Sequence, residues 1–300
     1  MKKLLLLINP NAGKGGFRNG LGDVLYTFHR AGYRVTVTFT NEHGDPARIA
    51  SRLAPDFDRL VCVGGDGTLG ETVAGFMQLP PERRPELGYI PMGTTNDCAI
   101  TLGLSHDPVQ AAYTAANGQT IPLDVGLFNQ RDYFTYVAAF GAFTEVSYET
   151  PQDQKNTFGR LAYILDALRR LPNLTHRWTE IQYDGGVLED DFIFGAVANS
   201  RSIAGVLRLD ELGVSLSDGL FEIILIRTPE SLLQLGTIVT DILANHFESE
   251  YVTVLQTRQV SFKFREPVAW TLDGEDGGSH RTVTCDNISR VVRMVVNEYD

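Results

Sequence analysis

A short glycine-rich loop contains the residue types best suited to bind a phosphate. After an apolar run at 60–63, the chain reads Gly64, Gly65, Asp66, Gly67 and Thr68. Glycines let backbone amides approach an anion, and a helix starting after them would point its positive end at it. Asp66 would oppose the anion unless it holds a divalent cation or moves a proton. The loop predicts phosphate chemistry; an ordinary strand-to-helix turn is the alternative.

Two further loops of small and polar residues follow other predicted strands, at 9–16 and 92–97. Lys14 offers a cation, and the amides and hydroxyls of both loops can donate hydrogen bonds to a phosphate. A solvated lysine or a helix cap also explains each loop taken alone. If the loops converge, the predicted phosphate-binding residues are Asn9, Gly13, Lys14, Gly64, Gly65, Gly67, Thr68, Gly93, Thr94, Thr95 and Asn96.

Four aspartates are the predicted Mg²⁺ ligands, because carboxylate oxygens suit a hard cation. Asp66, Asp97 and Asp124 would hold one ion through water beside the phosphates. Asp218, in the turn at 215–220, would hold a second ion together with backbone carbonyls. Each has an ordinary alternative: a helix cap for Asp97, and turns for Asp124 and Asp218.

An alternation of strands and helices must position these loops in the first 125 residues. Apolar or β-branched runs predict strands, and helical spacing of apolar residues predicts helices. The predicted strands are 3–9, 35–39, 60–63 and 88–91, and the predicted helices are 17–31, 45–53 and 68–76. The pattern indicates a doubly wound, Rossmann-like α/β nucleotide-binding domain, whose ligands bind beyond the carboxyl ends of the strands.

The pattern changes near residues 124–126, where longer, aromatic strands begin. They are predicted at 133–141, 178–184, 192–200, 220–227, 260–264, 268–274, 281–286 and 291–296. Two helices, at 157–171 and 229–247, interrupt them. We therefore predict two domains, 1–125 and 126–300, the second an all-β sandwich or distorted barrel with inserted helices. The active site is expected in the cleft between the domains.

Composition narrows the classes of function. A net charge of −11 argues against nucleic-acid binding, which needs clustered Lys and Arg. Three widely spaced cysteines suggest neither a disulfide framework nor a zinc site, and favour the cytoplasm. No stretch has the ~18 to 20 apolar residues of a membrane-spanning helix.

One segment, 155–177, carries five basic residues and one acidic residue, a local charge of +4. It could bind an anionic membrane surface or be an ordinary cover helix.

Together these motifs resemble the diacylglycerol kinase catalytic-domain family, which includes bacterial soluble diacylglycerol kinases and the sphingosine and ceramide kinases. The resemblance covers nearly the whole chain. It rests on NPNAGKG, GGDGT, PMGTTND, the later Ser217-Asp218-Gly219 and Asp273-Gly274-Glu275, and FGRLAYILDAL at 158–168. The chain departs from the family pattern at 200–217, where a glycine pair and a proline are usual, and this leaves the substrate open.

The resemblance implies that ATP, with Mg²⁺, phosphorylates a lipid hydroxyl, with diacylglycerol as the leading substrate. It places Glu275 opposite Asp66 in the cleft and a structural Mg²⁺ at Asp218. We assign Asp66 chiefly to Mg²⁺ and Glu275 to the role of general base, because a base must lie beside the lipid hydroxyl. Asp276 is an alternative base, and an acidic hairpin turn is the ordinary explanation of this stretch.

Two other functions compete with the lipid kinase. NAD kinases share GGDGT, but they show an Asn-Glu pair after the loop, and no such pair lies between Thr68 and Asp124. A non-catalytic lipid- or nucleotide-binding regulator would not need Asp66, Asp97 and Glu275 around a phosphate, which they would repel. The expected partners are ATP, a lipid at the inner face of the membrane, and a second copy of the chain in a homodimer.

Overall fold

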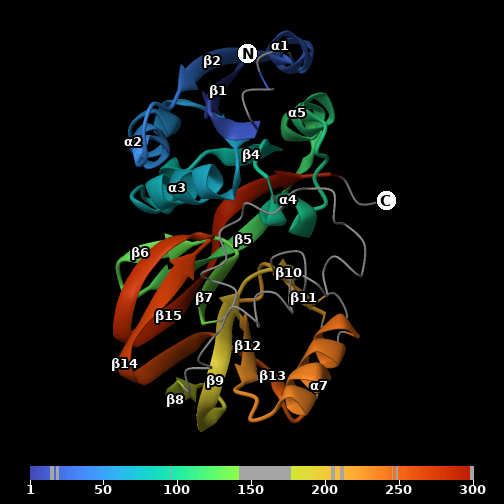
Figure 1. Ribbon diagram of the computed structural model, residues 1–300. Helices are drawn as coiled ribbons and strands as arrows, with labels where there is room; N and C mark the ends of the chain where they lie inside the picture. Colours follow the sequence, from blue (N-terminus) through green and yellow to red (C-terminus); the bar gives the residue numbers. More distant parts are fainter. Residues whose placement is uncertain are drawn as a thin grey trace.

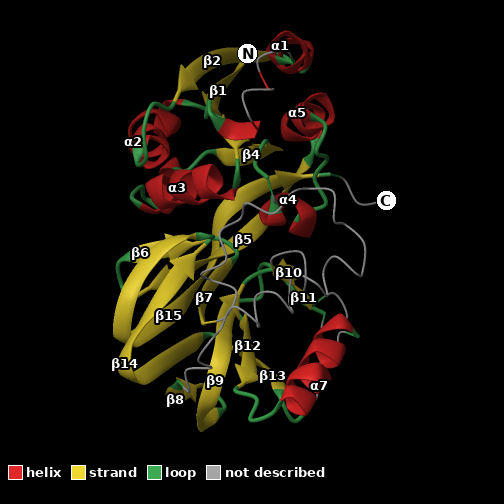
Figure 2. Ribbon diagram, viewed as in Figure 1, coloured by secondary structure: helices red, strands yellow, loops and turns green. Residues whose placement is uncertain are grey.

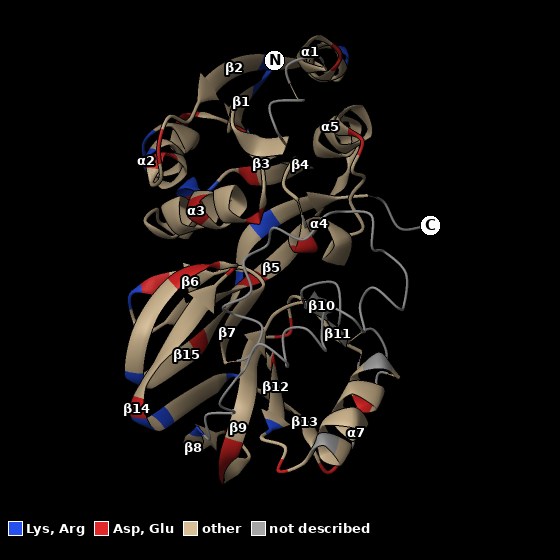
Figure 3. Cartoon of the chain, viewed as in Figure 1, with Lys and Arg blue, Asp and Glu red and all other residues tan. Residues whose placement is uncertain are grey.

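The chain folds into an α/β part and a strand-rich part, linked by two long strands that run between them (Figures 1 and 2). The computed structural model describes residues 1–13, 17, 20–94, 96–141, 177–203, 207–209, 213–244, 246–247 and 249–297. Within these residues, no helix is both long and apolar enough to span a membrane. Acidic and basic residues are interspersed along both parts (Figure 3).

The first part is a parallel sheet in the order β2-β1-β3-β4 with helices on both faces. Its elements are β1 Lys2–Ile8, α1 Leu21–Arg30, β2 Tyr33–Phe39, α2 Asp45–Leu53, β3 Arg59–Gly64, α3 Asp66–Met77, β4 Glu86–Pro91, α4 Asp97–Thr101 and α5 Pro108–Asn117. Leu4 and Leu6 of β1 pack with α1 and α5, while Leu5 and Leu7 pack with α2 and α3. Burial on both faces explains why β1 is a continuous apolar run. The predicted doubly wound fold is confirmed.

The second part consists of long antiparallel strands around an aromatic core. Its elements are β5 Gln119–Phe128, β6 Asp132–Phe134, β7 Val137–Gly141, β8 Trp178–Tyr183, β9 Gly186–Ala198, β10 Ser202–Ile203, β11 Leu207–Arg208, β12 Phe221–Arg227, α7 Leu232–Leu243, β13 Val252–Thr257, β14 Gln259–Leu272 and β15 Glu275–Val296. Trp270 packs against Phe128, Phe140 and Phe262 inside it. The strand-rich fold class predicted for the second part is confirmed.

Two strands are longer than the sequence pattern suggests. The runs predicted at 260–264 and 268–274 belong to one strand, β14, and those at 281–286 and 291–296 belong to β15. The register shifts between Lys263 and Val268 in β14 and between Ile288 and Val292 in β15. Such bulges carry polar residues, so they resemble turns in sequence. Strands β5 and β13 and helix α5 were also missing from the prediction.

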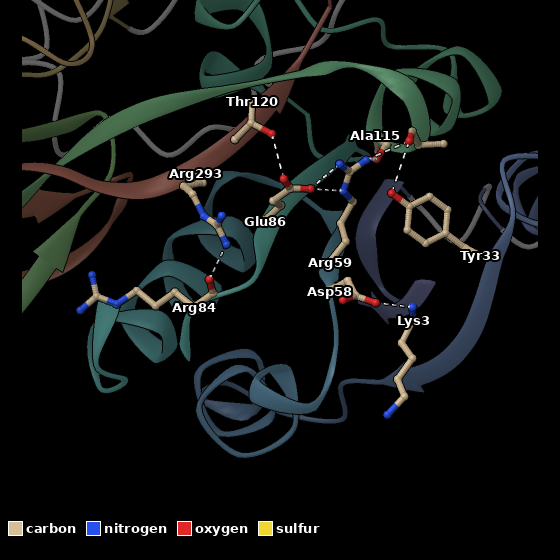
Figure 4. A network of polar contacts seen from close by, with 10 residues as sticks. Lys3, Tyr33, Asp58, Arg59, Arg84, Glu86, Ala115, Thr120 and Arg293 are labelled. Atoms are coloured by element: carbon tan, nitrogen blue, oxygen red, sulfur yellow. Dashed lines mark hydrogen bonds and ion pairs between the residues drawn. The ribbon is translucent and has the colours of Figure 1, made fainter. Parts of the chain in front are cut away.

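The end of β15 returns to the first sheet, where Met294 pairs with Leu87 of β4. Polar contacts at the same edge fasten the two parts together (Figure 4). Glu86 accepts a hydrogen bond of 3.1 Å from Arg59 Nε and one of 3.3 Å from Thr120 at the start of β5. Arg293 of β15 donates to the Arg84 carbonyl at 3.0 Å. The domain division between residues 125 and 126 remains a proposal. The end of β15, although it lies late in the sequence, pairs with the sheet of the first part.

Several predicted features lie outside the described residues. They are the helix at 157–171, the motif at 158–168, the basic segment 155–177 except Arg177, and the site residues Lys14 and Thr95. The second predicted helix, at 229–247, is observed as α7. Its Ile238, Val239 and Ile242 pack against the sheet.

Candidate active site

The three glycine-bearing loops meet at the carboxyl edge of the first sheet. Asn9 donates its carboxamide to Thr68 Oγ1 at 3.0 Å, and the Met92 amide donates to the Gly64 carbonyl at 2.7 Å. A Cβ built on Gly93 would stand 2.7 Å from the Cα of Gly65. Parallel strands end at one edge, so loops far apart in sequence become neighbours.

A cavity of about 450 Å³ opens over these loops. Asn9 and Gly13 of the first loop line it, with Gly65, Gly67 and Thr68 of the second and Gly93 and Thr94 of the third. Glu275, from the second part of the chain, also lines it. The cavity is therefore a cleft between the two parts, in which backbone amides of the first part face a carboxylate of the second.

Two of the predicted glycines leave no room for a Cβ. Gly13 has φ +58°, and a Cβ there would stand 2.8 Å from the Met92 carbonyl oxygen. A Cβ on Gly64 would approach the side chain of Thr68 within 2.6 Å. Both contacts are closer than real Cβ atoms tolerate, so these positions serve the close packing of the loops.

Asn96 stabilises the third loop through hydrogen bonds to its backbone. Its backbone has φ 54°, its side chain is buried, and its carboxamide accepts from the Gly93 amide at 2.8 Å and donates to the Gly93 carbonyl at 2.9 Å. Tyr89 donates its hydroxyl to the same carboxamide oxygen at 3.4 Å. Asn tolerates the left-handed conformation better than most residues. Asn96 thus shapes the loop that lines the cavity, although its own side chain is not part of the lining.

Asp66 begins α3, and its carboxylate reaches the amino end of α4. It accepts hydrogen bonds from the amides of Asp97 at 3.0 Å and Cys98 at 3.2 Å. Burial raises the pKa of Asp66 to about 6, against the lowering effect of these amides, and the nearby Asp273 raises it further. Asp97 is buried beside it. Asp66 and Asp97, two of the three residues predicted to bind the catalytic metal, are therefore neighbours, although neither is part of the cavity lining.

Asp124 lies in a different cluster, with the loop that contains Asp218. It accepts from the Gly219 amide and the Arg290 amide, both at 2.7 Å, and is fully buried. Asp218 accepts from the Leu220 amide at 3.0 Å. Among the described residues, no three His, Cys, Asp or Glu side chains come close enough to hold a metal ion. The structure thus brings together Asp66 with Asp97, and Asp124 with the Asp218 loop.

Glu275 reaches the cavity from a two-residue hairpin turn between β14 and β15. The turn residues Asp273 and Gly274 have φ 51° and 88°, the left-handed pair that Asp-Gly favours in such turns. A Cβ on Gly67 would stand 2.8 Å from Glu275 Oε1. The neighbouring Asp276 instead accepts from the Gly278 amide at 2.9 Å. The stretch is thus a hairpin turn, and Glu275 after it lines the cavity whereas Asp276 does not. The role of Glu275 as the base remains a prediction.

The cavity lining also contains residues that the sequence did not single out. Thr40, Glu42 and His43 line it from the loop between β2 and α2, and Glu71 lines it from α3. The Glu71 carboxylate contacts His43 Nδ1 at 2.6 Å and accepts from the Gly44 amide at 2.7 Å. Glu71 lies four residues after Gly67, on the same face of α3. That spacing was the signal available in the sequence.

Buried carboxylates predict how stability depends on pH. Burial raises the pKa of Asp66 to about 6 and of Glu222 to about 7. Groups with raised pKa values stabilise the folded state below their unfolded pKa values, near 4, and this contribution is lost as pH rises through 6 and 7. The midpoint of thermal unfolding in EDTA should therefore be higher at pH 6 than at pH 8.

Single variants separate the two contributions. Glu222→Gln and Asp66→Asn should each flatten the pH profile, and the double variant should flatten it more than either. A midpoint that rises from pH 6 to pH 8 in the unmodified protein would contradict the assignment.

Two family models match the chain. The diacylglycerol kinase catalytic domain matches residues 3–128, and the YegS C-terminal NAD kinase beta sandwich-like domain matches residues 138–294. The first range covers the glycine loops, and the second covers the hairpin that contains Glu275. Both parts of the cavity therefore fall within matched regions.

Curated relatives match over nearly their whole length. A diacylglycerol kinase of Bacillus subtilis (strain 168) is 33% identical over 280 residues, which are 93% of this chain and 91% of that protein. A diacylglycerol kinase of Staphylococcus carnosus (strain TM300) is 34% identical over 281 residues, 92% and 90% of the two chains. These matches extend across both parts of the fold.

Solved structures show the same fold. A crystal structure from Bacillus anthracis (strain Sterne) superposes with a TM-score of 0.82 at 26% identity, and covers 99% of this chain and 96% of that chain. Another from that strain, described as a diacylglycerol kinase, has a TM-score of 0.76 at 22% identity, with 99% and 97% covered. The family models and the relatives at 33–34% identity agree, and the chain belongs to the diacylglycerol kinase catalytic-domain family.

Proposed function

We propose that this protein transfers the γ-phosphate of ATP to the hydroxyl of a lipid, diacylglycerol, to give phosphatidic acid. The observation that carries the proposal is the position of Glu275 beside Gly67 in the cavity lining, which sets a carboxylate from the strand-rich part against the glycine loop. The relatives named diacylglycerol kinase support this choice of substrate.

The two sides of the cavity have complementary tasks in this reaction. The glycine-loop amides bind and orient the phosphates, which is most of what phosphoryl transfer asks of a protein. Glu275 accepts the proton of the lipid hydroxyl while the hydroxyl oxygen forms a bond to the γ-phosphorus. The bond between that phosphorus and the leaving ADP oxygen breaks. A base on the strand-rich part meets the acceptor, while the α/β part holds the donor.

Mg²⁺ is expected with ATP, and the residues present suit it. The Asp66 carboxylate, with Asp97 beside it, offers hard oxygen ligands, and Mg²⁺ in kinases typically takes one or two carboxylates and completes its shell with phosphate and water. Mg²⁺ held there would neutralise charge on the transferred phosphoryl group. We propose Asp218 as a ligand of a separate structural ion, with Asp124 holding the loop in place.

The end of the cavity near His43 suits the nucleoside. The carboxylates of Glu42 and Glu71 line it and disfavour a phosphate there. Glu71 holds the loop through His43 and Gly44, so the exposed imidazole forms a wall of this end.

His43→Ala should raise the KM for ATP about threefold to tenfold and leave kcat unchanged. This is the effect of losing one polar contact worth about 1 kcal/mol. Steady-state kinetics at varied ATP measures it, and His29→Ala, an exposed histidine on α1, is the matched control. Equal effects of the two variants would exclude His43 from the nucleoside end.

One assay tests the function itself. The protein is incubated with labelled ATP and Mg²⁺ and with diacylglycerol, sphingosine, a polyprenol or NAD in parallel. Label in phosphatidic acid supports the proposal, label in NADP supports the NAD kinase alternative, and no transfer to any acceptor supports a non-catalytic regulator. The homodimer and the membrane-surface location remain predictions.

A further inference from the structure

The hairpin turn that presents Glu275 has an unusually buried first residue. Asp273 is 7% exposed, whereas Glu275, two positions later, is exposed in the cavity. Two-residue hairpin turns usually lie at the surface, where an aspartate serves only the local backbone. The burial of Asp273 therefore calls for contacts beyond the turn.

Those contacts go to the two residues between β6 and β7 and to the first residue of β7. Asp273 Oδ2 accepts from the amide and the hydroxyl of Thr135, both at 2.6 Å, and Oδ1 accepts from the amides of Tyr136 and Val137, both at 3.0 Å. The Asp273 amide donates to the Val137 carbonyl at 2.8 Å. Five hydrogen bonds thus fix one turn residue to a segment more than 130 positions away in sequence.

The same turn lies against two glycines of α3. A Cβ on Gly70 would stand 3.1 Å from Asp273 Oδ2 and 3.5 Å from Thr135 Oγ1. The corresponding atom on Gly67 would stand 2.8 Å from Glu275 Oε1. Gly67 and Gly70 are three residues apart, so they share one face of the helix. At these two positions the helix has no side chains, and the Asp273 and Glu275 carboxylates occupy the space.

We propose that Asp273 is a positioning residue that holds Glu275 over the glycine loop. Its bonds to Thr135, Tyr136 and Val137 fix the turn in the left-handed conformation from which β15 starts at Glu275. Gly70 leaves room for the Asp273 carboxylate, and Gly67 leaves room for the base. The proposal rests on the proposed function, because it gives Asp273 a role only through Glu275.

Loss of one acceptor oxygen of Asp273 should loosen the hairpin turn from the residues at 135–137. Asn has the shape of Asp but a single acceptor oxygen, so Asp273→Asn leaves donors on Thr135 to Val137 without partners and sets an amide group against them. A displacement of about 1 Å at a catalytic group can cost about 100-fold in rate. Asp273→Asn should accordingly lower kcat about 10- to 100-fold, with the KM for ATP within about twofold of normal.

A double-mutant cycle distinguishes positioning from a general effect on the fold. Asp273→Asn, Glu275→Gln and the double variant are compared by kcat on dispersed diacylglycerol. If Asp273 acts through Glu275, Asp273→Asn should cost less than about threefold in the Glu275→Gln background, because groups that act as a unit are non-additive. Equal losses in both backgrounds, or no loss in either, would overturn the proposal.

Further variants keep the test decisive. Asp276→Asn, which removes an exposed carboxylate at the same turn, should keep kcat near normal. If Asp273→Asn does not fold, Gly70→Ala takes its place in the cycle, with Gly22→Ala as control, since nothing lies within 4 Å of a Cβ at Gly22. Alanine favours the helix at both positions, so a loss confined to Gly70→Ala reports the contact with Asp273. An unmodified protein inactive on diacylglycerol would refute the proposed function instead.

Discussion

Glu275→Gln is expected to lower turnover on diacylglycerol by at least two orders of magnitude while ATP affinity stays nearly unchanged. Glutamine has nearly the same size as glutamate but cannot accept the hydroxyl proton, and general base catalysis typically contributes 10²–10⁴-fold. Glu275 lies against Gly67 at the edge of the phosphate loop, so the change removes a proton acceptor and leaves the loop amides in place. Initial rates at saturating ATP, together with calorimetric titration of ATP, measure both effects.

Asp276→Asn is the matched control for this variant. Its carboxylate accepts from the Gly278 amide and does not line the cavity, so its removal should leave turnover within about twofold of normal. If Glu275→Gln weakened ATP binding and left turnover at saturation near normal, the roles given to Glu275 and Asp66 would have to be exchanged.

Local sequence explains how much of the first part could be predicted. Helix α2 begins at Asp45 and ends at Leu53, as its Asp-Pro start and periodicity predict. The glycine loops are also local, because each follows directly from the strand before it. Their convergence needed only the rule that parallel strands end at one edge of a sheet.

The second part was harder because its strands bend within long runs. Pro267 and the polar residues beside it interrupt β14 at a bulge, where the strand loses its ladder bonds but continues. A bulge and a turn use similar residues, so the sequence indicated two strands where the structure has one. The return of β15 to β4 depends on a contact between residues about 200 positions apart, which no local pattern encodes.

The residues of the candidate site likewise differ in whether local sequence or long-range packing determines their place. Asp66 and Gly67 were predicted from one pentapeptide, whereas the partners of Asp66 on α4 and the place of Asp124 in another cluster follow from tertiary packing. The contact between Glu71 and His43 likewise depends on the loop between β2 and α2 folding over α3. Residue type alone gives candidates, and long-range contacts decide what each of them touches.

Asp66→Asn is expected to lower turnover by two or more orders of magnitude and also to weaken the binding of ATP with Mg²⁺. A metal-organising carboxylate acts on bound phosphate in the ground state as well as in the transition state, so both kcat and ATP affinity should fall. This double effect distinguishes Asp66 from Glu275, whose loss should affect turnover alone. Titration of ATP with and without Mg²⁺ checks it: the unmodified protein should show a strong Mg²⁺ dependence and the variant a weak one.

The same variant should not lower the thermal midpoint at pH 8, because two effects on folding oppose each other. Asparagine can serve only one of the two α4 amides well, and a lost hydrogen bond costs about 1 kcal/mol. Burial, however, raises the pKa of Asp66 from 3.8 to about 6, so the ionised carboxylate destabilises the fold at pH 8 by up to about 3 kcal/mol. Removal of the charge therefore outweighs the lost bond. A variant that kept most of its activity would remove Asp66 from the mechanism, and one that lost activity together with several degrees of thermal stability would mark Asp66 as a cap for α4.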